Sequence, residues 1–252
     1  MGTVNQQSLE TNKKVLLFTA HPDDHLICAG TLMWLKDQGF ELQEIVATGG
    51  EKGPWFEDEN IQKVDFDKNE LKEVRQAEIG QAAKIIGIDK TTFLGLPDSA
   101  VVKTPKLVER LVEIIRQERP VMIFVHNPYD YHSDHIEVSK MVLEAAERAM
   151  WTYLPELGKS YKVPIILLAE GFYFGKPHVL VDITDYKKKK EEVVDAYLSQ
   201  IYPRERALLE SINKYRGFFL RDHNKTDAEC FEIPDQYPID FRRLMDIFSK
   251  RI

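Results

Sequence analysis

The chain has 252 residues and a formal net charge of −7 at pH 7, because 41 acidic side chains outnumber 34 Lys and Arg side chains. This acidic balance disfavours nucleic acid as a partner, since phosphate binding needs a strongly basic surface. The sequence shows neither a run of about eighteen apolar residues nor an apolar leader, so we expect a cytoplasmic protein without a membrane span. The two cysteines are too few for a disulfide framework.

Over the first 150 residues, short apolar segments alternate with helical patterns. Strands are predicted where apolar runs end in turns, at 15–18, 42–47, 92–94 and 121–125. Helices are predicted where apolar residues recur at near-helical spacing, at 26–35, 68–86 and 107–117, and from the end of a loop over 126–133 to about 150. Helices between strands favour right-handed crossovers, so we expect a Rossmann-like α/β three-layer sandwich with a mostly parallel sheet.

The C-terminal part is more variable in pattern. Strands are predicted near 165–169 and 179–181, and helices over about 184–201 and from about 205. Residues 52–66 carry few periodic apolar positions and are predicted to form a long loop, which is uncommon unless functional. We expect one domain over 1–252, with 1–13 as a flexible N-terminal tail.

Two clusters of metal-binding side-chain types follow two of the predicted strands. The first is AHPDDH at 20–25, and the second is HSDH at 132–135. Five of the seven histidines lie in or beside these two loops. Ligands of open parallel sheets bind outside the carboxyl ends of the strands, so the two loops are predicted to form one metal site.

The residue types in these loops suit a catalytic metal. A catalytic zinc site keeps three protein ligands and an open position for water, whose pKa falls to about 7. Taken singly, these residues have plainer interpretations. Asp23 or Asp24 could cap a helix that begins near His25, and Asp134 with Glu137 resembles a capping pair. Their clustering at two strand ends favours the metal site.

Together the motifs AHPDD and HxDH resemble the LmbE-like, or PIG-L, family of zinc-dependent N-deacetylases. Weaker similarities follow in the family's order, namely T-x-G-E at 48–51, R-x-x-E at 75–78, L-G-x-x-D at 94–98, S-Q at 199–200 and A-E-x-F at 228–231. The resemblance covers about residues 14–232.

The resemblance implies that zinc is bound by His21, Asp24 and His135, a ligand set that also suits Fe²⁺, Mn²⁺ or Co²⁺. It further implies that Asp23 is the general base for the attacking water. His132 would stabilise the oxyanion and could protonate the leaving amine, and Asp134 would orient a histidine.

Substrate-binding residues are also implied by the resemblance, namely Arg75, Asp98 and Glu51. The chain departs from the family pattern at two positions. His25 stands where the family usually has Glu, and Tyr197 stands where members often carry His. Neither departure removes a residue of the implied catalytic set.

The implied function is a metal-dependent hydrolase that removes an N-acyl group, expected to be acetyl, from an N-acetylglucosamine-like sugar or conjugate. Its partner would be that small molecule. Assembly into a homo-oligomer is left open, because family members are often oligomeric. Two alternatives stay open: a metal-dependent phosphoesterase, which a second metal would favour, and a non-catalytic protein that binds a sugar conjugate.

Overall fold

The computed structural model describes residues 13–53, 68–171 and 173–249. The expected tail and most of the expected loop over 52–66 therefore lie outside the described residues. In the described part, seven strands form one sheet in the order β3-β2-β1-β4-β5-β7-β6. The strands are β1 (Lys14–Thr19), β2 (Glu41–Thr48), β3 (Lys90–Leu96), β4 (Met122–His126), β5 (Ile165–Ala169), β6 (Val179–Asp182) and β7 (Ala228–Glu232). β1 to β5 are parallel, and β7 is antiparallel to β5 and β6, which confirms the mostly parallel sheet.

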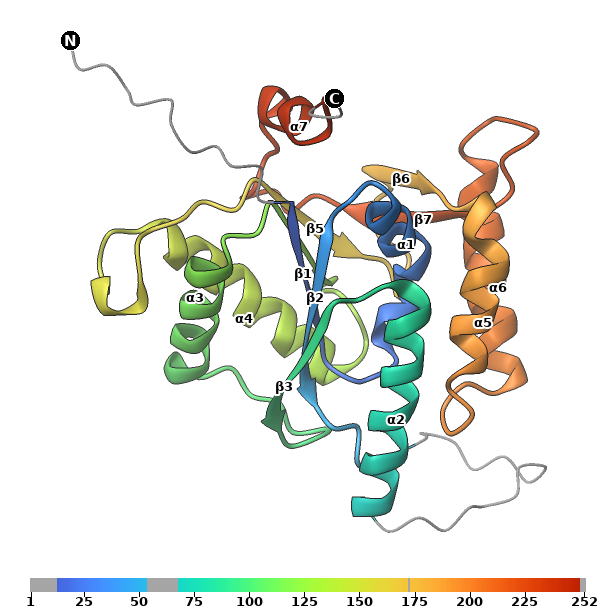
Figure 1. Cartoon of the computed structure of the whole chain (residues 1–252), viewed down its shortest axis with the longest axis horizontal. Helices are drawn as coiled ribbons and strands as arrows, with labels where there is room; N and C mark the ends of the chain where they lie inside the picture. The colour runs from blue at the N-terminus through green and yellow to red at the C-terminus, as the bar shows by residue number, and fades with distance from the viewer. Residues whose placement is uncertain (1–12, 54–67, 172, 250–252) are drawn as a thin grey trace.

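Helices cover both faces of this sheet, as predicted (Figure 1). One face carries α3 (Pro105–Glu118) and α4 (Ser133–Met150), and the other carries α1 (Ala29–Asp37), α2 (Lys68–Ile86), α5 (Lys187–Asp195) and α6 (Pro203–Phe218). The last described helix, α7 (Phe241–Ser249), was not predicted. It packs Phe248 on Trp34 of α1, with ring centroids 5.8 Å apart.

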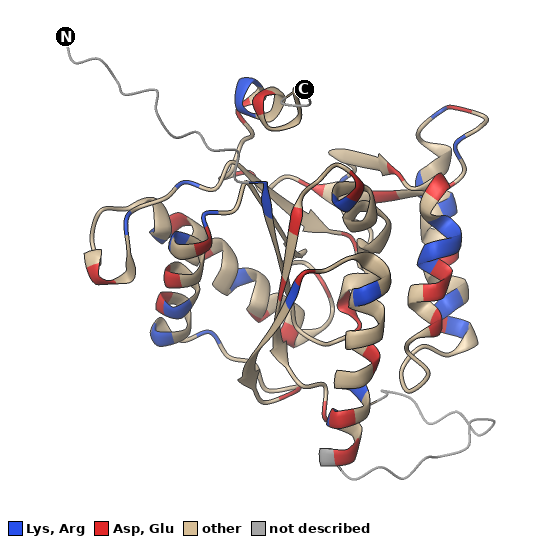
Figure 2. Cartoon of the chain, viewed as in Figure 1, with Lys and Arg blue, Asp and Glu red and all other residues tan. Residues whose placement is uncertain are grey.

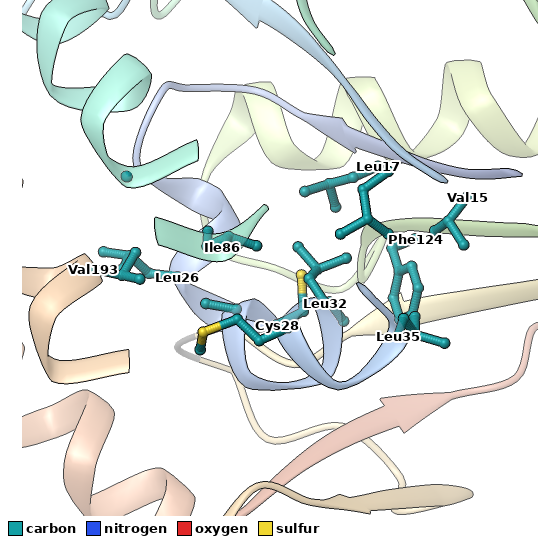
Figure 3. Close-up of a cluster of buried hydrophobic side chains, with 14 of the residues drawn as sticks. Val15, Leu17, Leu26, Cys28, Leu32, Leu35, Ile86, Phe124 and Val193 are labelled. Carbon is teal, nitrogen blue, oxygen red and sulfur yellow. The ribbon is translucent and has the colours of Figure 1, made fainter. Parts of the chain in front are cut away.

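Alternation along the strands divides the core between the two faces of the sheet. Val15 and Leu17 of β1 belong to the cluster beneath α1 and α2, part of which Figure 3 shows. Leu16 and Phe18, the residues between and after them, belong to the cluster beneath α3 and α4. Both faces of β1 are therefore apolar, as expected for a central parallel strand covered on both sides.

The helix predicted over about 184–201 is wrong at its C-terminal end. A 3₁₀ turn (Thr184–Tyr186) leads into α5, which ends at Asp195. The chain then turns, and the carbonyl of Tyr197 accepts hydrogen bonds from the amides of Gln200 and Ile201. The helix predicted over 26–35 is likewise divided into a 3₁₀ turn (Asp24–Ile27) and α1.

β7 was not predicted as a strand from the sequence. Its residue Glu229 connects it to the start of α1, near the N-terminal end of the chain. Its carboxylate accepts hydrogen bonds from the amides of Gly30 and Thr31, at 2.9 and 2.7 Å, where α1 begins. Helix N-termini leave such amides unpaired and favour a negative charge. Figure 2 shows acidic and basic residues interspersed along α5 and α6, but Lys190 of α5 is buried and donates to Glu229 at 2.7 Å.

Strand order places a crevice beside β1. The chain moves outward from β1 to β2 and β3, then returns to β4 on the other side of β1. The connections after β1 and β4 therefore diverge, which is where open α/β sheets bind their ligands. Among the described residues, no helix combines the length and apolar character needed to cross a bilayer.

Candidate active site

The loop after β1 is held in shape by Asp24. One carboxylate oxygen, Oδ2, accepts the amides of Ala20 and His21 at 2.9 and 2.6 Å. The carbonyl of Ala20 accepts the hydroxyl of Thr48, which closes the loop onto the end of β2. These contacts turn the side chain of His21 and the second oxygen of Asp24 toward the crevice.

Three of the predicted ligand groups meet there. His21 Nδ1 lies 3.3 Å from His135 Nε2, which lies 3.2 Å from Asp24 Oδ1, and His21 Nδ1 is 3.5 Å from Asp24 Oδ2. A tetrahedral ion with bonds of about 2.0–2.2 Å holds its ligand atoms roughly 3.3–3.6 Å apart. The donor set fits a divalent metal ion, as do the distances of His135 to His21 and to Asp24 Oδ1, whereas the 3.5 Å contact of His21 is to Oδ2, the oxygen that accepts the two amides.

Three overlapping groups of described residues could hold an ion: His21 with His132 and His135, Asp24 with His126 and His135, and His21 with Asp98 and Asp134. The predicted triple combines members of the first two. The carboxylates of the third group already accept backbone amides from residues 52, 99 and 101, which makes that group a weaker candidate. His126 Nε2, in the second, already accepts the amide of Ala20 at 3.1 Å.

Electrostatics favour a cation between the two histidines. Burial lowers the pKa of His135, but Asp24 and Asp130 outweigh burial and raise that pKa to about 9. The pKa of His21 is also raised well above its usual value, because the charge of Asp24 and hydrogen bonds from the imidazole to carboxylates outweigh burial, which lowers it. Imidazoles that attract protons so strongly lie in a negative environment, which equally suits a divalent metal ion.

Two residues that support the ligands were not assigned by the sequence analysis. Asp130 accepts the backbone amide of His132 at 3.0 Å and lies 3.1 Å from His135 Nδ1. His126, at the end of β4, stacks on the ring of His135 with centroids 3.9 Å apart and lies 3.1 Å from Asp24. Metal-binding residues commonly need such oriented partners. Asp130 and His126 could have been found from the sequence, because they lie in or beside the loop that carries His132 and His135.

Asp23 points to a different partner from its neighbour Asp24. Arg75 of α2, only 3% exposed, donates from Nη2 to Asp23 Oδ1 at 2.6 Å and from Nη1 to the Gly50 carbonyl at 2.9 Å. Asp23 precedes the 3₁₀ turn but makes no side-chain capping bond, so the capping interpretation does not explain it. The guanidinium holds one oxygen of Asp23, and Asp23 is among the residues that line the crevice.

Asp98 and Glu51 form a supporting layer on the β3 side. Asp98 accepts the amide of Lys52 at 2.8 Å and lies 3.3 Å from His21 Nε2. Burial opposes ionisation of Asp98, but His21 and the Lys52 amide lower its pKa. Glu51 accepts the amide of Asp98 at 3.0 Å and is not among the described residues that line the crevice.

His132 and Asp134 begin α4. His132 Nδ1 accepts the amide of Asp134 at 3.1 Å, so the neutral ring carries its proton on Nε2. Burial and the charges of nearby histidines lower the pKa of His132 to about 4, which keeps the ring neutral. Asp134 does not cap the helix; it accepts the amides of Ser99 and Val101 and lies 3.3 Å from His21 Nε2.

The crevice is a cavity of about 380 Å³, within the usual range for small-molecule sites. We call its polar base the floor, which consists of His21, Asp23, Asp24, Arg75, Asp98, His132 and His135. We call its mouth the rim, which consists of Tyr131, Gln200, Ile201, Tyr202, Arg204, Glu205 and Leu208. Seven of the nine predicted site residues thus line one cavity. The sequence analysis assigned none of the rim.

Comparison with known proteins identifies the family of the chain. The model of the GlcNAc-PI de-N-acetylase family, PIG-L, matches residues 16–146. The chain belongs to the PIG-L family. This PIG-L member is 30% identical over 197 residues to the diacetylchitobiose deacetylase of Thermococcus kodakarensis, covering 75% of this chain and 70% of that protein. The family and the fold class predicted from the sequence are confirmed.

Solved structures extend the similarity of fold. The N,N'-diacetylchitobiose deacetylase of Pyrococcus horikoshii has a TM-score of 0.77 and 24% identity, covering 94% of this chain and 92% of that one. GalB, the 4-carboxy-2-hydroxymuconate hydratase of Pseudomonas putida, has a TM-score of 0.77 and 20% identity, covering 87% and 95%. At these identities the comparison shows the fold alone. Because a hydratase has it too, the function of the PIG-L member must be argued from its site.

Proposed function

We propose that this PIG-L member is a metal-dependent N-deacetylase that hydrolyses the acetamido group of an N-acetylglucosamine-type sugar. The observation that carries the proposal is the triple of His21, Asp24 and His135, with contacts of 3.2–3.5 Å, beside an Asp23 held by Arg75. The 30% identical relative, named as a diacetylchitobiose deacetylase, supports the class of substrate.

His21, Asp24 and His135 would hold the metal, with zinc as the expected ion. When bound, the ion would act as a Lewis acid that makes a water molecule more acidic and polarises the amide carbonyl. Asp23 would take the proton of the attacking water, because it lines the crevice and Arg75 holds one of its two oxygens, Oδ1. Arg75 thereby fixes which lone pairs of the base are available.

His132 would stabilise the charge that develops on the carbonyl oxygen. Its Nε2–H is a preoriented donor because Nδ1 is engaged by the start of α4. Asp134, bonded to the loop after β3 and close to His21 Nε2, would keep that histidine in its orientation. As the C–N bond breaks, Asp23 would return its proton to the departing amine, which balances the hydrolysis to acetate and a free amino sugar.

The experiment is reactivation of the chelator-treated protein with one metal at a time: Zn²⁺, Fe²⁺, Mn²⁺ or Co²⁺. Release of primary amine is followed from N-acetylglucosamine and from N,N'-diacetylchitobiose, and bound metal is counted by elemental analysis. We expect about one ion per chain and metal-restored amine release. One tightly bound ion without amine release from either sugar would contradict deacetylation of these substrates. Hydrolysis of a phosphate ester by a protein with two ions would instead favour the phosphoesterase.

A further inference from the structure

Behind the floor lies a chain of three buried polar side chains from three separate elements. Glu44 comes from β2, His25 from the 3₁₀ turn after the first motif, and Tyr197 from the turn after α5. His25 and Tyr197 are 0% exposed and Glu44 is 1% exposed. His25 Nδ1 lies 3.1 and 3.2 Å from the two carboxylate oxygens of Glu44, and His25 Nε2 lies 2.8 Å from the Tyr197 hydroxyl.

The chain ends on the loop that carries the floor. The hydroxyl of Tyr197 donates to the carbonyl of Pro22 at 2.7 Å. A phenol has one proton and a carbonyl can only accept, so His25 Nε2 must be the donor to the phenol oxygen. Glu44 holds the same imidazole from its other nitrogen. The ring of His25 therefore cannot rotate without breaking a buried hydrogen bond, and the hydroxyl is fixed on Pro22.

Pro22 lies between His21 and Asp23, so the orientation of its carbonyl sets the peptide from which Asp23 projects. The side chain of Asp23 is held from the crevice side by Arg75. Tyr197 holds the backbone from behind. A base within a hydrogen bond of its proton must be placed to a fraction of an ångström, and these two contacts hold the side chain of Asp23 and the peptide that precedes it.

Tyr197 also reaches the rim. Its carbonyl accepts the amides of Gln200 and Ile201, two rim residues, at 3.2 and 2.9 Å. Between them and Tyr197, Ser199 binds Glu78 of α2 through its amide and hydroxyl at 2.8 and 2.6 Å. Tyr197 therefore joins the backbone of the floor to Gln200 and Ile201, where the C-terminal part of the rim begins.

We propose that Tyr197, His25 and Glu44 are positioning residues that hold the Pro22–Asp23 peptide in the orientation that places Asp23 against the substrate. This inference rests on the proposed deacetylase function for the effect on rate, but not for the effect on the loop itself. The three side chains lie outside the floor and touch no substrate. Their role is to act through Asp23.

The principal test is Tyr197→Phe, which removes one oxygen and keeps the ring. The matched control is Tyr161→Phe, because Tyr161 also donates its hydroxyl to a proline carbonyl, that of Pro120 at 2.9 Å, away from the crevice. We expect Tyr197→Phe to lower kcat at least about tenfold with KM within about twofold, since a misplaced base slows the reaction more than it weakens binding. The metal content should match wild type, and the control should keep its kcat. A kcat within twofold of wild type for Tyr197→Phe would overturn the inference.

Hydrogen exchange supplies a readout that needs neither substrate nor metal. The amides of Asp24 and Leu26 bond to the carbonyls of His21 and Asp23 at 3.3 and 3.1 Å. In Tyr197→Phe, deuterium uptake over residues 20–28 should rise, whereas Tyr161→Phe should leave it unchanged. If wild type released no amine, the proposed function would fail, and this measurement alone would decide the positioning role. Unchanged uptake over 20–28 in Tyr197→Phe would overturn it.

A second variant guards against a Tyr197→Phe protein that does not fold. His25→Gln breaks the same chain one link earlier and should lower kcat and raise uptake over 20–28 in the same way. Where both single variants fold, the double variant should cost about as much as either one, because residues that act as a unit are not additive. Multiplication of the two single effects would contradict a connected chain.

Discussion

Replacement of Gly50 by alanine tests the contact between Arg75 and Asp23 without touching either residue. Gly50 has φ of +67°, and a Cβ built there would lie 2.3–2.6 Å from three atoms of the Arg75 guanidinium. Ordinary contact begins at about 3.4 Å, so the guanidinium must move by about 1 Å. Arg75 is 3% exposed, so this movement must break its 2.6 Å bond to Asp23 or displace Asp23 with it.

The expected loss in kcat is on the order of 10²-fold, the usual effect of a 1 Å misplacement of a reacting group. Gly39→Ala is the matched control. Gly39 also has a positive φ, +79°, but its Cβ would meet only the amine of Lys13, at 3.9 Å. Both variants should lose roughly 1–2 kcal/mol of stability from the left-handed backbone. Gly50→Ala should unfold at a lower temperature than Gly39→Ala, because it also displaces the buried guanidinium.

The assay compares initial rates of amine release, metal content and unfolding temperature for wild type and the two variants. Gly50→Ala should keep its metal, because none of the three proposed ligands contacts Gly50 directly. A Gly50→Ala protein as fast as Gly39→Ala would refute the reasoning, since it would show that the guanidinium contact is not needed to place the base.

Three further outcomes follow from the contacts described above. Asp23→Asn should lower kcat by about 10²–10⁴-fold and keep the metal, whereas His135→Ala should lose the metal itself. Elemental analysis and rate measurements distinguish these two outcomes. A fully active Asp23→Asn protein would reject Asp23 as the base. Glu229→Gln should lower the free energy of unfolding by about 3–5 kcal/mol, because it leaves a buried lysine without its counter-charge; a loss below about 1 kcal/mol in denaturant titration would count against this. Burial raises the pKa of Cys28 well above its usual value and that of Cys230 to about 12, so a thiol reagent at pH 8 should label both only after unfolding.

Elements with local signals could be predicted closely. α2 was expected over 68–86 and occupies those residues. Apolar positions recur along one side of this helix, and Gly87, with φ of +90°, follows it as a C-terminal stop. β5 was expected over 165–169 and also occupies those residues, because a short apolar run between turns has few alternatives in a parallel sheet.

The break after α5 has no comparable signal. Residues 184–201 contain neither glycine nor proline, so helix propensity alone predicts a continuous helix. In the structure, Tyr197 is fully buried against Pro22 and His25, and Ser199 bonds to Glu78. These contacts join residues more than 120 positions apart and outweigh local preference, which a single sequence does not display.

The floor was easier to predict than the groups that hold it. Histidines and aspartates gather in two short segments, and strand order brings those segments together. Glu44, by contrast, is a carboxylate in the middle of the mostly buried strand β2, where a charge is rare unless it is paired. Its partner His25 was visible only as a departure from the family pattern. The two departures, His25 and Tyr197, are in contact at 2.8 Å, so neither could be interpreted alone.

The family match and the cavity overlap only in part, and we expect substrate choice to depend on the part of the cavity that lies beyond the match. The match over 16–146 contains all nine predicted site residues, whereas the rim from Gln200 to Leu208 lies beyond it. An N-acetyl group must meet the floor whatever the sugar carries, but the attached group must meet the rim. Leu208, 42% exposed, offers apolar surface there, and Tyr131, a rim residue that lies inside the match, is 62% exposed beside it.

Substitution at the rim should therefore change the preference among N-acetylated sugars and leave the chemistry intact. Leu208→Ala or Tyr131→Ala should alter the ratio of kcat/KM between N-acetylglucosamine and N,N'-diacetylchitobiose, because only the larger sugar extends beyond the acetamido ring. The metal content should be unchanged, and Asp23→Asn should lower kcat by the same factor in either rim variant as in wild type. An equal loss for both sugars would show that the rim holds the floor in place rather than reading the substrate.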